Sequence, residues 1–189
     1  MLFDHRHENW VDHGAVLSYT DFEWADPDSC WAAQCVERNG KFYLYVTLST
    51  TAAGGARAIG VAVSDSPTGP FKDAIGKPLC GPDWAYIDPT VLIDDDGQAY
   101  LYFGNPTLHY VKLKKNMIEL DGEITATNMT SEQFGSNESM NSLYTEGPWI
   151  YKRDGIYYMV YAASGIPETI DYSTSDSPTG PWEYQGRIM

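Results

Sequence analysis

Hydrophobic and polar positions alternate on both sides of three short polar turns. The segments read AQCVERNGKFYLYV, TVLIDDDGQAYLYF and PWIYKRDGIYYMVY, with turns at Asn39-Gly40, Asp96-Gly97 and Asp154-Gly155. Alternation with a period of two is typical of half-buried strands. Asn-Gly and Asp-Gly suit a two-residue type I′ turn, because both central residues of that turn take φ > 0. The pattern therefore predicts three β-hairpins.

The hairpins belong to a longer repeat, because the turn glycines are 57 and 58 residues apart. After a predicted third strand in the first and last units, the same seven letters, SDSPTGP, occur at 64–70 and 175–181. Ser-Pro and Thr-Gly-Pro favour a tight connection to a fourth strand. No apolar period of 3.6 residues is sustained over the length of a usual helix. We therefore predict an all-β fold.

Units of four antiparallel strands and about 40 to 60 residues are typical of β-propeller blades. We predict one partial propeller domain over 1–189, with a β-sandwich as the alternative architecture. Its three four-stranded blades are expected at 29–79, 85–124 and 144–188. Residues 1–28 are expected to supply the last strand of a preceding blade and a connection.

The two ends of the chain share the pattern W-x-x-x-G, at Trp10 and again at Trp182. The chain is therefore expected to start and stop at the same point of the repeat. Three blades are fewer than the four to eight that close a propeller. Further blades, or another copy in a homo-oligomer, are expected to cover the open sheet edges.

Charge and composition limit the function classes. The formal net charge is −14 with only 12 Lys and Arg, which disfavours nucleic acid and acidic membranes as partners and favours a neutral ligand. The first ten residues lack the apolar segment of a signal peptide, so a cytoplasmic location is slightly favoured. The three cysteines and four histidines show no metal-ligand spacing, so we predict no metal and no cofactor.

The candidate chemistry lies nine residues before each turn glycine, where the three units hold Trp31, Asp88 and Glu146. Asp88 and Glu146 start equivalent strands of adjacent blades, so their side chains are expected to be neighbours. Two carboxyl groups fit glycoside hydrolysis, which needs one protonated and one ionised group. An ionised Asp88 is expected to raise the pKa of Glu146. The alternative is that both carboxylates only cap strand starts or bond to backbone.

Two tryptophans are candidates for a sugar-binding platform. Trp31 shares the position of the two carboxylates in the repeat, and Trp84 lies four residues before Asp88. Indole rings can stack on a pyranose or furanose face. The alternative for both is hydrophobic packing between blades.

Segments from the whole chain resemble glycoside hydrolase family 43. They are WAAQCVERNGKFYLY, IGVAVSDSPTGPF, YIDPTVLIDDDGQAYLYFG and TEGPWIYKRDGIYYMVYAA. The resemblance implies a five-bladed propeller related to β-xylosidases, α-L-arabinofuranosidases and arabinanases. It also implies that Glu146 is the general acid, and that Asp88 tunes the pKa of Glu146 and orients the substrate.

The resemblance also implies what this chain lacks. The general base of the family lies on a first blade that precedes this sequence, and Asp26, in EWADPDSC, resembles its motif but is outside the strand-start position. Calcium is implied only for the complete family fold. We therefore expect an inverting hydrolase of xylose- or arabinose-containing plant saccharides that has little activity as this chain alone. The alternatives are a non-catalytic carbohydrate-binding or interaction propeller and a structural scaffold.

Overall fold

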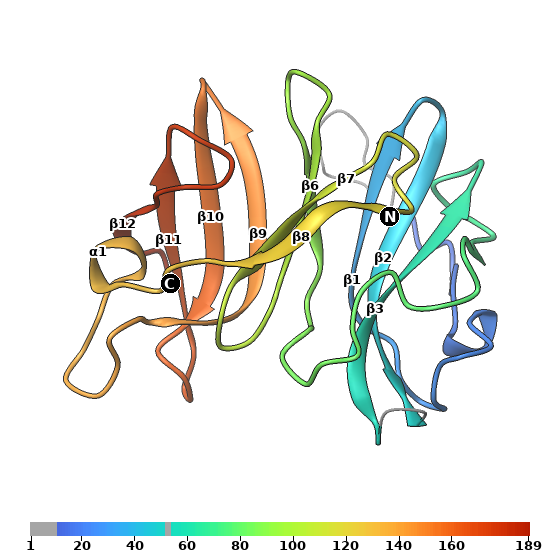
Figure 1. Cartoon of the computed structure of the whole chain (residues 1–189), viewed down its shortest axis with the longest axis horizontal. Helices are drawn as coiled ribbons and strands as arrows, with labels where there is room; N and C mark the ends of the chain where they lie inside the picture. Colours follow the sequence, from blue (N-terminus) through green and yellow to red (C-terminus); the bar gives the residue numbers. More distant parts are fainter. Residues whose placement is uncertain (1–10, 52–53) are drawn as a thin grey trace.

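The computed structural model describes residues 11–51 and 54–189 (Figure 1). Trp10, which carries the first W-x-x-x-G match, lies outside the described residues. Residues 11–28 contain one short 3₁₀ helix, η1 (Tyr19–Asp21), and no strand. Ser18 caps this helix, because its hydroxyl accepts the backbone N–H of Thr20 at 3.3 Å.

The described residues form three four-stranded antiparallel sheets, which confirms the predicted all-β, bladed architecture. The first sheet contains β1 (Trp31–Arg38), β2 (Lys41–Thr50), β3 (Ala56–Ser64) and β4 (Lys72–Asp73). The second contains β5 (Thr90–Ile93), β6 (Ala99–Phe103), β7 (His109–Leu113) and β8 (Leu120–Ala126). The third contains β9 (Tyr144–Arg153), β10 (Ile156–Ala163), β11 (Thr169–Ser175) and β12 (Glu183–Arg187). A four-residue helix, α1 (Ser131–Phe134), precedes the third sheet.

The first and last hairpins have the predicted two-residue turns. Asn39 and Gly40 have φ values of 55° and 76°, and Asp154 and Gly155 have 51° and 83°. Both central residues are thus left-handed, as a type I′ turn requires. Asparagine, aspartate and glycine tolerate this region better than other residues.

The middle hairpin differs, and the two-residue turn predicted there is wrong. Five residues separate β5 from β6, and of the central pair only Gly97 has positive φ, at 82°. The backbone N–H of Asp94 donates to the Gln98 carbonyl at 2.9 Å, and that of Gly97 donates to the Asp94 carbonyl at 2.8 Å. The Asp94 side chain at the start of this wider loop accepts hydrogen bonds from Lys152 and Tyr157 of the neighbouring sheet.

The core lies between successive sheets, whose inward residues alternate with outward ones. Buried residues between the first and second sheets include Tyr45, Ile59, Val61, Leu101, Phe103 and Val111. Those between the second and third include Tyr100, Tyr102, Leu108, Tyr157, Met159 and Tyr161. Buried apolar area of this kind is the main stabilising contribution to the fold.

The two outer faces of the stack differ. The first sheet is covered by Val16, Leu17, Phe22 and Trp24 from the segment that precedes it. On the third sheet, Ile150 points into the core, but its neighbours Trp149 and Tyr151 are 52% and 39% exposed. The third sheet therefore presents an aromatic face to solvent.

Hydroxyl groups tie each sheet to the next. Tyr45 donates to the Met117 carbonyl at 2.7 Å, and Tyr102 donates to the Pro178 carbonyl at 2.5 Å. Tyr45 and Tyr102 occupy the same position in their units, five residues after the turn glycine. Within the described part of the chain, no helix has the length and apolar content needed to cross a membrane.

Candidate active site

Asp88, at the start of the second sheet, forms hydrogen bonds to the first sheet and to the third sheet. It lies two residues before β5 with φ of 57°, a left-handed conformation that aspartate tolerates and most side chains do not. Its backbone N–H donates to the Thr47 hydroxyl of the first sheet at 2.9 Å. Its carboxylate Oδ2 accepts the backbone N–H of Gly147 in the third sheet at 3.0 Å.

Glu146 is the third residue of β9, at an irregularity in the pairing of β9 with β10. The next residue, Gly147, has φ of 59°, which glycine adopts without a Cβ clash. A bulge of this kind turns a side chain away from the regular alternation of the strand. The carboxylate Oε2 of Glu146 accepts the side-chain N–H of Asn105 at 2.6 Å.

The structure therefore places the two predicted carboxylates together. Asp88 bonds to the residue that follows Glu146, so adjacent blades deliver both groups to one point. The alternative, that the carboxylates only cap strand starts or bond to backbone, is met in part by Asp88, because its carboxylate accepts a backbone N–H, although that N–H belongs to the neighbouring blade. Beneath the pair, the fully buried Tyr144 donates its hydroxyl to the Gly104 carbonyl at 2.7 Å.

The electrostatics of the site centre on Asp88. Burial raises the pKa of this carboxyl above its usual value, and the Gly147 N–H partly offsets that effect. The negative charges of Glu146 and Glu168 raise the pKa of Asp88 further. Like charges are thus concentrated at this end of the sheets, which is a common property of functional sites.

Trp31 and Trp84 are brought together beside this pair. Trp31 begins β1 and is 42% exposed, and Trp84 is 65% exposed, so neither is buried between blades. The guanidinium carbon of Arg57 lies 4.6 Å from the ring centre of Trp31 and 5.4 Å from that of Trp84. Trp31 pairs with Thr47, whose hydroxyl contacts Asp88. The aromatic cluster is therefore linked to Asp88 through Thr47.

Sequence reasoning missed three residues of the site: Asn105, Arg57 and Glu168. Asn105 follows β6, at a position where the other units hold Leu48 and Ala163. This polar residue among apolar equivalents is a signal that a unit-by-unit comparison could have found. Arg57 and Glu168 have no such signal, because their roles depend on contacts between units.

Asp26, the residue with local similarity to a base motif, makes a local backbone contact instead. Its Oδ1 accepts the backbone N–H of Thr51 at 2.6 Å, and its own N–H donates to the Ser49 carbonyl at 2.8 Å. Residues 11–51 and 54–189 contain no group of three or more His, Cys, Asp or Glu side chains placed to hold a metal ion. The residues described do not fit a metal centre of that composition.

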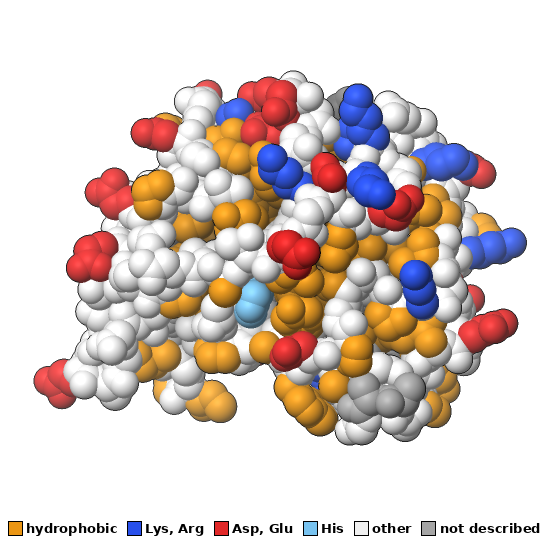
Figure 2. All heavy atoms as spheres, in the orientation of Figure 1, with side chains coloured by type: hydrophobic (Ala, Val, Ile, Leu, Met, Phe, Trp, Pro, Cys, Tyr) orange, Lys and Arg blue, Asp and Glu red, His pale blue; other side chains and the backbone are white. Residues whose placement is uncertain are grey.

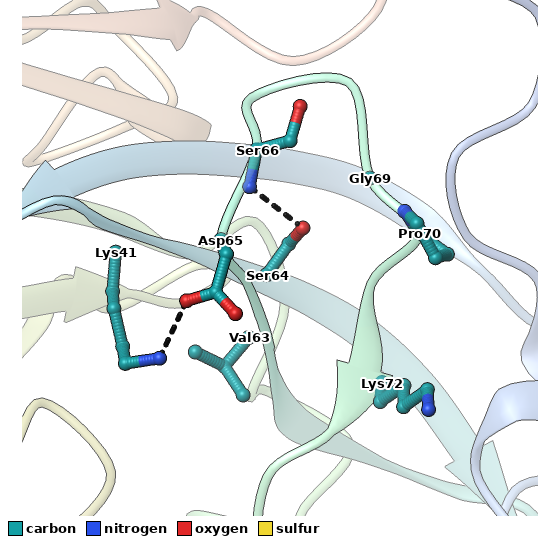
Figure 3. Close-up of a pocket in the computed structure, with 8 residues that line it drawn as sticks. All are labelled: Lys41, Val63, Ser64, Asp65, Ser66, Gly69, Pro70 and Lys72. Carbon is teal, nitrogen blue, oxygen red and sulfur yellow. Dashed lines mark hydrogen bonds and ion pairs between the residues drawn. The ribbon is translucent and has the colours of Figure 1, made fainter.

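A hollow of about 420 Å³ lies at the other end of the first sheet, far from the carboxylates (Figure 3). Lys41 and Asp65 point toward one another across it at 2.6 Å, and Lys72 lies beside them. An equivalent hollow of about 260 Å³ occurs in the third sheet, lined by Ile156, Asp176 and Glu183 among others. Both hollows are lined by residues of the SDSPTGP turn, whereas the two lysines of the first are replaced by Ile156 and Glu183 in the second. The hollow therefore follows from the repeated turn and indicates no common ligand.

The comparisons with known proteins agree with this geometry. The family model described as Glycosyl hydrolases family 43 matches residues 7–189. A protein of Bacteroides ovatus named Xylosidase/arabinosidase is 33% identical over 94% of this chain and 62% of its own length. Beta-D-galactofuranosidase xynD of Aspergillus niger is 32% identical over 92% of this chain and 51% of its own length.

Solved structures show the same arrangement of sheets. An α-L-arabinofuranosidase from Clostridium thermocellum is 36% identical, with a TM-score of 0.78 over 96% of this chain and 59% of that protein. A GH43_1 enzyme from Xanthomonas citri, solved as a complex with xylose, is 33% identical, with a TM-score of 0.81 over 94% and 60%. This chain thus spans between about half and two thirds of the length of these relatives. From the family match and these identities, the chain belongs to glycosyl hydrolase family 43.

Proposed function

We propose that this chain supplies two carboxylates of an inverting glycosidase that acts on xylose- or arabinose-containing plant saccharides. The observation that carries the proposal is the 3.0 Å hydrogen bond from the Gly147 N–H to Asp88 Oδ2. It joins the strand starts of two blades and so brings Asp88 beside Glu146. Glycoside hydrolysis needs one carboxyl group that is protonated, and a second carboxyl group beside it can tune its protonation.

In this proposal Glu146 is the general acid. Water attacks the anomeric carbon and gives one proton to a general base, the bond from that carbon to the leaving oxygen breaks, and the Glu146 proton passes to the leaving oxygen. Asn105, 2.6 Å from Glu146 Oε2, fixes the orientation of the carboxyl group. Asp88 orients the substrate, and its charge acts on Glu146 when it is ionised.

An inverting mechanism also needs a base, about 6.5–9.5 Å from the acid, to activate the water. In the first sheet the equivalent strand-start position holds Trp31, which cannot act as a base. We propose that the base comes from polypeptide outside the described residues, on further blades or on another copy of the chain. The exposed aromatic face of the third sheet, with Trp149 and Tyr151, is where such a partner is expected to pack.

A neutral pentose is the sugar that the site supports best. The exposed indoles of Trp31 and Trp84 offer flat apolar surfaces beside Asp88, as saccharide stacking requires. The Xanthomonas citri relative was solved with xylose and with xylotriose. The Bacteroides ovatus relative is named for both xylosides and arabinosides. A binding module without catalysis is the second candidate, favoured by the tryptophan at the first strand start.

The test uses azide as an external nucleophile that replaces base-activated water. Turnover of xylobiose, an aryl xyloside and an aryl arabinofuranoside is measured with and without azide, for the wild type and for Glu146→Gln. We expect weak turnover that rises with azide or with protein concentration. General acid catalysis commonly contributes about 10²–10⁴-fold, so Glu146→Gln should lose about that much on xylobiose.

The aryl glycosides are the internal control. Their leaving groups depart with little proton donation, so Glu146→Gln should affect them much less than xylobiose. Equal turnover of xylobiose by the wild type and Glu146→Gln would refute the acid assignment. Saccharide binding that is unchanged by the substitution, with no turnover under any condition, would favour the binding module.

A further inference from the structure

Arg57 occupies an unusual position, because its guanidinium contacts two exposed indoles, those of Trp31 and Trp84. The three side chains come from β1, β3 and the loop before β5, and their distances are 4.6 Å to Trp31 and 5.4 Å to Trp84. The loop is anchored at this point, because the Asp83 N–H donates to the Arg57 carbonyl at 2.8 Å. The backbone thus holds the rings and the cation in one cluster.

The planar guanidinium has two faces and an edge with five N–H donors. In this cluster the guanidinium carbon lies over both indole rings, and the N–H donors that are not otherwise used remain available for hydrogen bonding. One donor, on Nη1, bonds to the Gly55 carbonyl at 3.2 Å. Among the described residues, no carboxylate lies within 4.0 Å of Arg57 to form an ion pair.

The surroundings make this positive charge distinctive. Most lysine and arginine side chains visible in Figure 2 lie in its upper half, whereas β1 begins at the lower end of the sheets in Figure 1. The chain carries a net charge of −14, which repels anions in general. A guanidinium with no carboxylate partner among the described residues, as at Arg57, is therefore suited to receive an anionic group against this overall repulsion.

We propose that Trp31, Arg57 and Trp84 form a subsite for a carboxylate-bearing sugar, such as a uronosyl substituent on the saccharide chain. The inference rests on the proposed function, because it places the neutral sugar at Asp88 and Glu146. The edge of an arginine matches the two oxygens of a carboxylate, and the outer indole faces suit the apolar face of the sugar ring. The preferred substrate is then an acidic, branched saccharide.

The experiment compares two ligands by calorimetry: xylotriose, and xylotriose with one glucuronosyl substituent. We expect the wild type to bind the acidic ligand about tenfold more tightly, as one charge-assisted contact allows. Arg57→Gln should remove this preference and change the xylotriose affinity by less than about threefold. Raising the salt concentration should reduce the preference of the wild type, because an exposed ion pair is screened.

Two further variants keep the test decisive. Arg153→Gln removes an exposed arginine, 77% accessible, at the turn end of the third sheet, and should leave the preference intact. Arg57→Lys retains the charge without the planar edge and should retain only part of the preference. Each variant is first checked for wild-type melting, so that a loss of binding is not a loss of folding.

A wild type without preference, or a preference that survives Arg57→Gln, overturns the subsite. This outcome differs from failure of the proposed function, which is decided by xylobiose turnover. Preference for the acidic ligand without turnover keeps the subsite and rejects the hydrolase. Turnover without a preference for the acidic ligand keeps the hydrolase and rejects the subsite. If the wild type binds neither ligand, the subsite is also rejected.

Discussion

Strand β5 has an aspartate at each end, and the two lie in opposite electrostatic environments. Asp88, before the strand, receives a single backbone N–H and faces the charges of Glu146 and Glu168. Asp94, after the strand, bonds to Lys152 at 2.9 Å and to the Tyr157 hydroxyl at 2.6 Å. Both aspartates contact the third sheet, so residue type and interface are the same.

The difference shows how stability and chemistry are separated along one strand. Burial acts to raise the pKa of Asp94, but the bonds from Tyr157 and Lys152 more than offset it and lower that pKa. The pKa of Asp88 is raised instead. The turn end therefore fastens the second and third sheets together, while the strand-start end holds two like-charged carboxylates, Asp88 and Glu146, close to one another.

The largest expected effect is a loss of turnover on substitution of Asn105, which tests the strand-start end of the sheets. Asn105→Ala removes the 2.6 Å contact to Glu146 and should reduce azide-assisted xylobiose turnover about tenfold or more, because hydrogen bonds to charged groups contribute about 1.5–3 kcal/mol. Asn105→Asp is the matched variant. It should be worse, since it adds a like charge beside Glu146. Unchanged turnover in both variants would remove Asn105 from the site.

The next effect concerns the turn end. Asp94→Asn should lower the stability at pH 7 by about 1 kcal/mol, a value that allows for partial solvent screening. The folded pKa of Asp94 is depressed, so its stabilisation is present above the usual value of 3.8 and is lost as the pH falls through the folded pKa. Urea unfolding at several pH values measures this dependence.

Asp65→Asn serves as the control for Asp94→Asn, because Asp65 forms an ion pair with Lys41 but is 85% exposed. Its melting temperature should stay within about 1 °C of the wild type. Equal destabilisation by the two substitutions would mean that the contacts of Asp94 with the third sheet contribute nothing to the free energy of unfolding.

The smallest effect has the opposite sign. Asp88→Asn should stabilise the protein at pH 7 by a fraction of 1 kcal/mol, or about 1–2 °C, because it removes a charge from a part-buried position among like charges. The folded pKa of Asp88 is raised, so its stability contribution is complete below 3.8 and is lost as the pH rises through the folded pKa. The gain should therefore disappear in acid, as melting curves at pH 3 and pH 7 would show. Destabilisation at pH 7 would contradict this account.

Much of the fold followed from the sequence because local rules act in each unit. Asn39-Gly40 and Asp154-Gly155 fix their turns through φ > 0 alone. At Asp96-Gly97 the same rule failed. There the Asp94 carboxylate accepts a hydrogen bond from the Tyr157 hydroxyl, and no local pattern could show a contact between residues 63 positions apart.

The site was predictable where the repeat carried it. Counting from the turn glycine brought Asp88 and Glu146 together, and the structure does the same. The sequence assigned a raised pKa to Glu146, which stays a prediction. In the structure, burial raises the pKa of Asp88. The sequence did not predict this, because the burial of a side chain depends on the neighbouring blades. Arg57 was missed for the same reason, since its partners lie in other elements.

The hydrogen bond from Gly147 to Asp88 makes the spacing of the two carboxylates depend on how the sheets tilt against one another. A small rocking motion at this boundary would separate the groups while each sheet kept its own ladder of hydrogen bonds. If the proposed function holds, gentle warming should then abolish azide-assisted xylobiose turnover before circular dichroism records any melting. The spacing of Asp88 and Glu146 is therefore set by the boundary between the second and third sheets and not by either sheet alone.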